Sequence, residues 1–257
     1  MSRSFFLLRS SGLHALHPLT KLVAVLAIVL IGFLARWPSL PIALFLFLIL
    51  PLAGWGKIAR DLVRVTVTVI LPFVVSIALV QGLFYPGSTH VLFSLGPLAF
   101  KEEGLIFAYG TAGKILLLAG AGLLLLFSTP PSDLMLALTE RGMPNALAYI
   151  VITAIQLLPQ MQAKAAAIVD AQRARGLETE GSILRRVSAI VPLLAPLVFG
   201  ALADVDERAM ALEARAFSAP RTRTSFKELR DTRAQALARW LVLVGAVAIG
   251  ALEFLGG

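Results

Sequence analysis

Five stretches of this chain are apolar over roughly the length needed to cross a lipid bilayer. A membrane-spanning helix takes about 20 consecutive apolar residues, because a helix rises about 1.5 Å per residue and the hydrocarbon core is about 30 Å thick. The stretches are Leu19–Ala35, Trp37–Gly56, Val65–Phe84, Leu105–Phe127 and Leu237–Leu255. The sequence therefore predicts an all-α, polytopic integral membrane protein with about five transmembrane helices.

The composition of the chain agrees with a membrane protein. Of its 257 residues, 58% are hydrophobic and only 15% are charged, whereas about a quarter of the residues in a soluble domain are charged. The chain has no cysteine, which excludes disulfides and thiolate-bound metal ions. A net charge of +8 is typical of cytoplasmic loops and lipid headgroup contacts in such a protein. We therefore expect the lipid bilayer, and not nucleic acid, beside its basic residues.

Lys and Arg in the short connections predict how the chain is oriented, because cytoplasmic loops are enriched in both. The connection from Tyr85 to Phe100 has no Lys or Arg, as expected for an outer loop. The basic residues of the other side are Arg3, Arg9, Lys21, Lys57, Arg60 and Arg64. We expect a cytoplasmic N-terminus and an outside C-terminus in the cell membrane of a bacterium or archaeon. Lys21, at the end of the first span, would snorkel to the interface.

Three regions follow from the distribution of charge. Residues 1–128 form a transmembrane bundle with four spans, residues 129–236 form helices at the cytoplasmic face, and residues 237–257 form the final span. Within the middle region, Met143–Pro159 and Val187–Ala203 are apolar but short or interrupted by proline. Such lengths favour helices that dip into the membrane or lie along it. Charged clusters around them indicate long amphipathic helices.

Two seven-residue stretches of the middle region resemble each other. Residues 171–177 read AQRARGL and residues 211–217 read ALEARAF, with Arg175 and Arg215 at the same offset. Gly176 is suited to end the first helix in a left-handed cap. A second helix would begin with Asp204 as its cap and run past Arg215. These arginines could simply complement the helix dipole, or could present a fork of donors to a carboxylate on another protein.

One basic residue falls inside a predicted span. An ionisable side chain at that depth, here Lys114, indicates a functional role unless the span is tilted so that it meets a backbone carbonyl or the cytoplasmic helices. The neighbouring Gly110, Gly113 and Gly120 would allow close contact with another helix.

Two other functions are compatible with parts of the sequence. Asp204, Asp206 and Glu207 could hold a metal ion in a membrane enzyme of lipid metabolism, although they also suit the start of a helix, and no second acidic cluster accompanies them. A self-contained permease is the other alternative, but the predicted spans contain few polar residues to bind a substrate.

The motifs together resemble the transmembrane T component of energy-coupling factor transporters, which are importers of the ATP-binding-cassette class. The resemblance covers nearly the whole chain. It rests on residues 17–21 (HPLTK), 128–134 (STPPSDL), 141–144 (RGMP) and 157–159 (LLP) and on the two arginine motifs. One departure is Ala216, where the family usually has glycine; we expect its helix to continue one residue further or to end differently.

The resemblance implies a coupling subunit without a cofactor, metal or catalytic site of its own. Two ATPase subunits would hydrolyse ATP, and a small substrate-binding (S component) membrane protein would take up a vitamin or a transition-metal ion. Arg175 and Arg215 would each enter a groove on one ATPase subunit. The implied docking residues are Ala174, Arg175, Gly176, Ala214, Arg215 and Ala216, supported by Arg173, Leu177 and Phe217.

Overall fold

The computed structural model describes residues 11–86, 91–95, 98–177, 183–217, 219 and 227–255. The chain forms two compact units. One, which we call the bundle, contains residues 3–144 and 229–257, and the other, which we call the helix pair, contains residues 145–228. Arg3 and Arg9, which contribute to the predicted orientation, lie outside the described residues.

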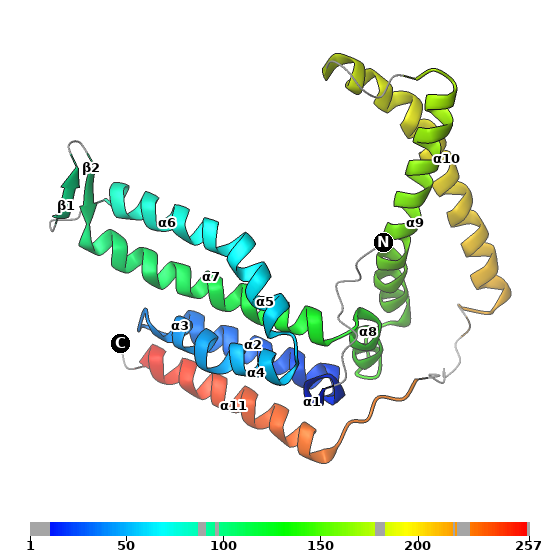
Figure 1. The fold of residues 1–257 in the computed structure, drawn as a ribbon. Coiled ribbons are helices and arrows are strands. Elements are labelled where there is room, and N and C mark those ends of the chain that lie inside the picture. The colour runs from blue at the N-terminus through cyan, green and yellow to red at the C-terminus, as the bar shows by residue number, and fades with distance from the viewer. Residues whose placement is uncertain are drawn as a thin grey trace. The chain divides into compact units, whose positions relative to one another are not determined.

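The bundle consists mainly of helices that are joined by short connections (Figure 1). A short helix, α1 (Gly12–Ala15), precedes α2 (Pro18–Leu34). Two longer helices each contain a π-helical turn. The first consists of α3 (Leu40–Leu44), η1 (Phe45–Ile49) and α4 (Leu50–Trp55), and the second of α5 (Ala59–Val65), η2 (Thr66–Ile70) and α6 (Leu71–Phe84). The bundle is completed by α7 (Glu102–Ser128), α8 (Pro131–Thr139) and α11 (Arg233–Leu255).

Each π-helical turn ends two residues before a proline. Leu50 donates its N–H to the carbonyl of Phe45, and Leu71 donates in the same way to Thr66; Pro51 and Pro72 follow. Proline has no N–H, and its ring crowds the carbonyl four residues earlier. A wider turn in front of the proline relieves that crowding and lets the helix continue.

A two-stranded antiparallel hairpin, which the sequence analysis did not predict, precedes α7. Its strands are β1 (Val91–Leu95) and β2 (Leu98–Lys101). The pairing register shifts between Val91 and Phe93. Strand β2 contacts both α6 and α7, so the hairpin lies at one end of these two helices (Figure 1).

The core of the bundle lies where α7 meets the two helices that contain π-helical turns. Ile49, Leu62 and Leu117 are completely buried there. Gly120 lets α7 approach η1 closely, because a Cβ at this position would collide with the ring of Phe45. Elsewhere α11 packs along α2, and α6 packs along α7.

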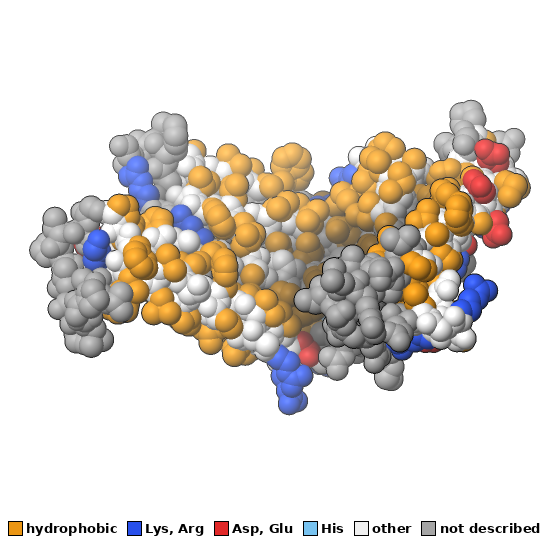
Figure 2. Space-filling view, turned by 90° about the horizontal axis from the view of Figure 1, so that it is seen from above, with side chains coloured by type: hydrophobic (Ala, Val, Ile, Leu, Met, Phe, Trp, Pro, Cys, Tyr) orange, Lys and Arg blue, Asp and Glu red, His pale blue; other side chains and the backbone are white. Residues whose placement is uncertain are grey.

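Apolar side chains are spread widely over the visible surface of the bundle in Figure 2. Phe47, Phe84 and Leu241 are among the large apolar residues that are more than two thirds exposed. In water such a surface would be unfavourable, whereas in lipid it is the expected exterior of a spanning helix.

Four helices in the described part of the chain are long and apolar enough to cross a membrane. They are Ala59–Phe84, Glu102–Ser128, Asn145–Ala174 and Arg233–Ala251. Three of them overlap predicted spans, and the all-α, multi-pass prediction is confirmed. The first two predicted spans form the shorter apolar helices Pro18–Leu34 and Leu40–Trp55.

Lys21 is not at the lipid interface as predicted, because its side chain is buried within the bundle. Its ammonium group donates to the carbonyl oxygen of Ser128 at 2.8 Å and to that of His14 at 3.4 Å. Ser128 is the last residue of α7, so the cation binds a carbonyl at the negative end of that helix.

The helix pair consists of two long helices, α9 (Asn145–Ala174) and α10 (Ile183–Ala214), which pack on each other (Figure 1). The two stretches predicted to be short or interrupted by proline lie in long helices instead: α9 continues through Pro159, and α10 through Pro192 and Pro196. Asp204 does not cap a helix either, since it lies well inside α10.

Candidate functional site

Helix α9 ends in a left-handed cap directly after the exposed Arg175. Ala174 is the last helical residue, and Gly176 has a positive φ of 87°. The N–H of Gly176 donates to the carbonyl of Arg173 at 2.9 Å, and the N–H of Leu177 donates to that of Gln172 at 3.0 Å. This pair of hydrogen bonds defines a Schellman cap. The predicted left-handed cap at Gly176 is confirmed.

Helix α10 ends in the same cap, although alanine replaces glycine. Ala216 has a φ of 55°. Its N–H donates to the carbonyl of Glu213 at 2.9 Å, and the N–H of Phe217 donates to that of Leu212 at 3.0 Å. The expectation that Ala216 would change the helix end is therefore wrong. The hydrogen bonds of the cap offset the cost of the left-handed conformation for a residue with a Cβ.

Both arginines are exposed, and the apolar residue after each cap is half-buried. The ring of Phe217 contacts that of Tyr149, near the start of α9, with centroids 5.3 Å apart. Among the residues that the structure describes, neither Arg175 nor Arg215 has a side-chain hydrogen bond or ion pair. Each guanidinium group therefore keeps its donors available for another molecule.

The two caps lie at opposite ends of the helix pair. Three contacts give an antiparallel register: Lys164 pairs with Asp204, Arg208 donates to Gln160 at 3.0 Å, and Tyr149 meets Phe217. In this register Arg215 is level with the second turn of α9. At a rise of 1.5 Å per residue, about 35 Å along α9 separates that level from Arg175. The arginines thus cannot share one ligand pocket.

A third helix ends in the same way, which the sequence analysis did not recognise. In α8, the N–H of Gly142 donates to the carbonyl of Thr139 at 3.0 Å, and the N–H of Met143 donates to that of Leu138 at 3.1 Å. Gly142 has a φ of 102°. The signal was present as Arg141-Gly142-Met143, which repeats the pattern arginine, glycine, apolar residue. Here, however, the guanidinium group of Arg141 pairs with Asp231.

The acidic cluster considered as a metal site has a different arrangement. Asp204 forms an ion pair with Lys164, while Asp206 and Glu207 are exposed on α10. In the described parts of the chain, no group of three or more acidic or histidine side chains converges as metal ligands would. The geometry therefore gives the metal-dependent enzyme no support.

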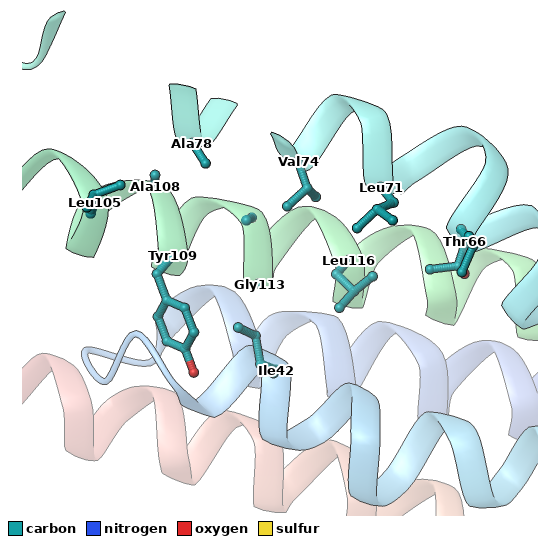
Figure 3. A pocket seen from close by; sticks show the side chains of 12 residues that line it. Ile42, Thr66, Leu71, Val74, Ala78, Leu105, Ala108, Tyr109, Gly113 and Leu116 are labelled. Atoms are coloured by element: carbon teal, nitrogen blue, oxygen red, sulfur yellow. The ribbon is translucent and has the colours of Figure 1, made fainter. Parts of the chain in front are cut away.

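A cavity of about 320 Å³ lies in the bundle between α3, η2, α6 and α7. Figure 3 shows Leu71 and Val74 pointing from one side of it toward α7. Among its lining residues only Thr66 and Tyr109 carry hydroxyl groups, and none is charged. Such a lining does not suit an ion or a strongly polar molecule. The predicted intramembrane cation, Lys114, is half-buried, and its ammonium group lies 5.9 Å from the centroid of the Phe33 ring, as in a cation–π contact.

Comparisons with known proteins match most of the chain. Residues 9–226 match the family described as Cobalt transport protein, CbiQ. An energy-coupling factor transporter transmembrane protein, EcfT, of Thermosediminibacter oceani is 28% identical over 257 residues, which cover 95% of this chain and 93% of the relative. The EcfT protein of Lacticaseibacillus paracasei is 33% identical over 249 residues, with 91% and 92% covered.

Proposed function

Because the chain belongs to the CbiQ family of cobalt transport proteins and is the transmembrane component of an energy-coupling factor transporter, we propose that it couples ATP hydrolysis to import. Two cytosolic ATPase subunits would bind Arg175 and Arg215, one subunit at each cap. Their closure on ATP would move the helix pair, and a separate substrate-binding membrane protein would respond. That protein would hold the substrate, a vitamin or a transition-metal ion.

The matched caps are the observation that carries this proposal. Two helix ends with the same hydrogen bonds present an exposed arginine followed by an apolar side chain. Two similar ATPase subunits would offer two similar grooves, and a separation of about 35 Å is on the scale of a small domain. The guanidinium group would bind a carboxylate in each groove. Leu177 and Phe217 would fill the apolar part beside it, with Arg173 supporting the first contact.

The cavity in the bundle supports a substrate site on another subunit. Its lining has two hydroxyl groups and no charged residue, whereas a protein that binds a metal ion or a charged vitamin supplies several polar ligands.

We also propose a division of the chain by function, in which residues 129–236 form the coupling region. Residues 1–128 and 237–257 would form the membrane part, with the N-terminus in the cytoplasm and the C-terminus outside.

Charge reversal at the two caps tests the proposal. The tagged protein is purified in mild detergent as wild type, Arg175→Glu, Arg215→Glu and the double variant, and the bound ATPase subunits and ATP hydrolysis are measured. Each single reversal should weaken ATPase binding about 30-fold or more, because it removes one partner of a desolvated charge pair. The double variant should bind none.

The control is Arg233→Glu, which makes the same change of charge at an exposed arginine outside the caps. Arg233 is the first residue of α11, where a negative charge suits the helix dipole, so this variant should bind as wild type does. The proposal would be refuted if the wild type recruited no ATPase subunit, or if the wild type and the three cap variants bound the ATPase subunits equally.

A further inference from the structure

The two positions at which the polypeptide passes between the units are tied to each other. The helix pair lies in the sequence between Pro144 and Leu229 of the bundle. Arg141 is three residues before the first of these positions, and Asp231 is two residues after the second. The Nη2 atom of Arg141 lies 3.0 Å from Oδ2 of Asp231. Residues ninety positions apart in the sequence therefore join the outgoing and returning segments.

Asp231 is itself held from the other side by a buried arginine. Arg239 donates from Nη1 and Nη2 to the two carboxylate oxygens of Asp231, at 3.0 and 2.7 Å. Its Nη1 also donates to the hydroxyl of Thr20 in α2 at 3.0 Å. Hydrogen bonding by Arg239 lowers the pKa of Asp231 below its ordinary value, so the carboxylate stays charged at neutral pH. The ion pair of Arg141 is thereby anchored to α2 and α11.

The two sides of this arrangement differ in exposure. The side chain of Arg141 is 59% exposed, whereas that of Arg239 is 9% exposed. An exposed ion pair adds little to the stability of a fold. The contact of Arg141 is therefore poorly suited to stabilising the bundle, and its location at the connection to the helix pair requires another explanation.

We propose that Arg141, Asp231 and Arg239 form a clasp that holds the outgoing and returning segments at one base, so that motion of the helix pair reaches the bundle. With the clasp closed, Arg141 before the helix pair and Asp231 after it are held together on the bundle. With it open, each connecting segment becomes a separate hinge and absorbs part of the motion. The role of the clasp in transport rests on the proposed function. Within it, Arg141 is a positioning residue and binds no ATPase subunit.

Spin labels can test the clasp without any partner or substrate. Because the chain has no cysteine, nitroxides on Gln162→Cys in α9 and Val244→Cys in α11, both exposed, label only these sites. Pulsed electron resonance then gives the distribution of distances between the units in the full chain. We compare the unaltered chain with Arg141→Ala, with Arg141→Lys, and with Arg233→Ala as a control at an exposed arginine outside the clasp.

The clasp predicts that Arg141→Ala gives a broader distribution than the unaltered chain, because the two connecting segments then move separately. Arg141→Lys should keep the width found for the unaltered chain, because a single donor of Arg141 makes the contact. The control should match the unaltered chain, and the melting temperature should stay the same in all four.

Equal widths in all four proteins would overturn the clasp, and so would a broad distribution that appears only with a lower melting temperature. The purification with ATPase subunits is separate from this measurement. Failure of ATPase binding would therefore refute the proposed function without being confused with failure of the clasp.

Discussion

Exchange of glycine and alanine between the two caps should change their stability in opposite directions. Gly176 and Ala216 occupy equivalent positions with positive φ, and a Cβ at Gly176 would touch nothing within 4 Å. Backbone conformation alone therefore decides the effect. A residue with a Cβ loses about 1–2 kcal/mol in the left-handed region, and the lower entropy of its unfolded chain offsets about 0.4–1 kcal/mol of this loss. The net change is about 0.5–1 kcal/mol, or about two- to fivefold in local opening.

Hydrogen exchange followed by mass spectrometry measures this opening at the N–H groups of Leu177 and Phe217. Protection should fall about two- to fivefold at the first in Gly176→Ala and rise by the same factor at the second in Ala216→Gly. The control is Gly200→Ala inside α10, where a Cβ also meets nothing within 4 Å. There the same substitution should stabilise the helix, by about 0.5–1 kcal/mol. If Gly176→Ala and Gly200→Ala changed protection in the same direction, the role assigned to φ would be wrong.

Two further predictions concern the bundle. Gly104→Ala should lower the melting temperature, by the equivalent of about 1–3 kcal/mol, because its Cβ would collide with the backbone carbonyl of Gln81. Gly122→Ala, whose Cβ meets nothing within 4 Å, should leave it unchanged. Equal melting temperatures in the two variants would contradict the contact between α6 and α7. Burial lowers the pKa of His17 in the folded chain below its ordinary value of 6.5. As the pH falls, His17 therefore takes up a proton in the unfolded chain before it does so in the folded chain. The wild type should lose stability as the pH falls below 6.5. His17→Asn, which keeps a side-chain acceptor for the N–H of Leu19, should lose less stability between about pH 7.5 and pH 5.5; the same loss in both proteins would count against this assignment.

Local chemistry made the cap at Gly176 predictable. An arginine in the last turn, a glycine after it and an apolar residue beyond are read from adjacent positions. At Ala216 the cost of a Cβ at positive φ predicts a different helix end, but the hydrogen bonds of the cap outweigh that cost. The role of Asp204 was not predictable, because acidic residues suit both a helix start and an exposed helix face.

Contacts between distant residues could not be found from the sequence in this way. Lys21 was expected at the interface because nothing near it indicated that the end of α7 would lie beside it. The pairing of Arg141 with Asp231 depends on how α8 and the segment before α11 pack. The π-helical turns, by contrast, have a local cause in Pro51 and Pro72, but proline alone does not predict them, because α9 and α10 continue as α-helices through Pro159, Pro192 and Pro196.

The lengths of the two antiparallel helices set the positions of Arg175 and Arg215 in steps of one residue. A cap fixes the direction of its arginine relative to the last turn, so the position of the guanidinium group depends on the number of residues before it. One inserted residue in α9 would advance Arg175 by about 1.5 Å but turn it by about 100° around the axis. Seven inserted residues would restore its direction about 10 Å further on. If the proposed docking is right, the spacing of the grooves on the ATPase subunits would match whole turns of α9 and α10, and the lengths of these helices would be constrained even where their exposed side chains are free to vary.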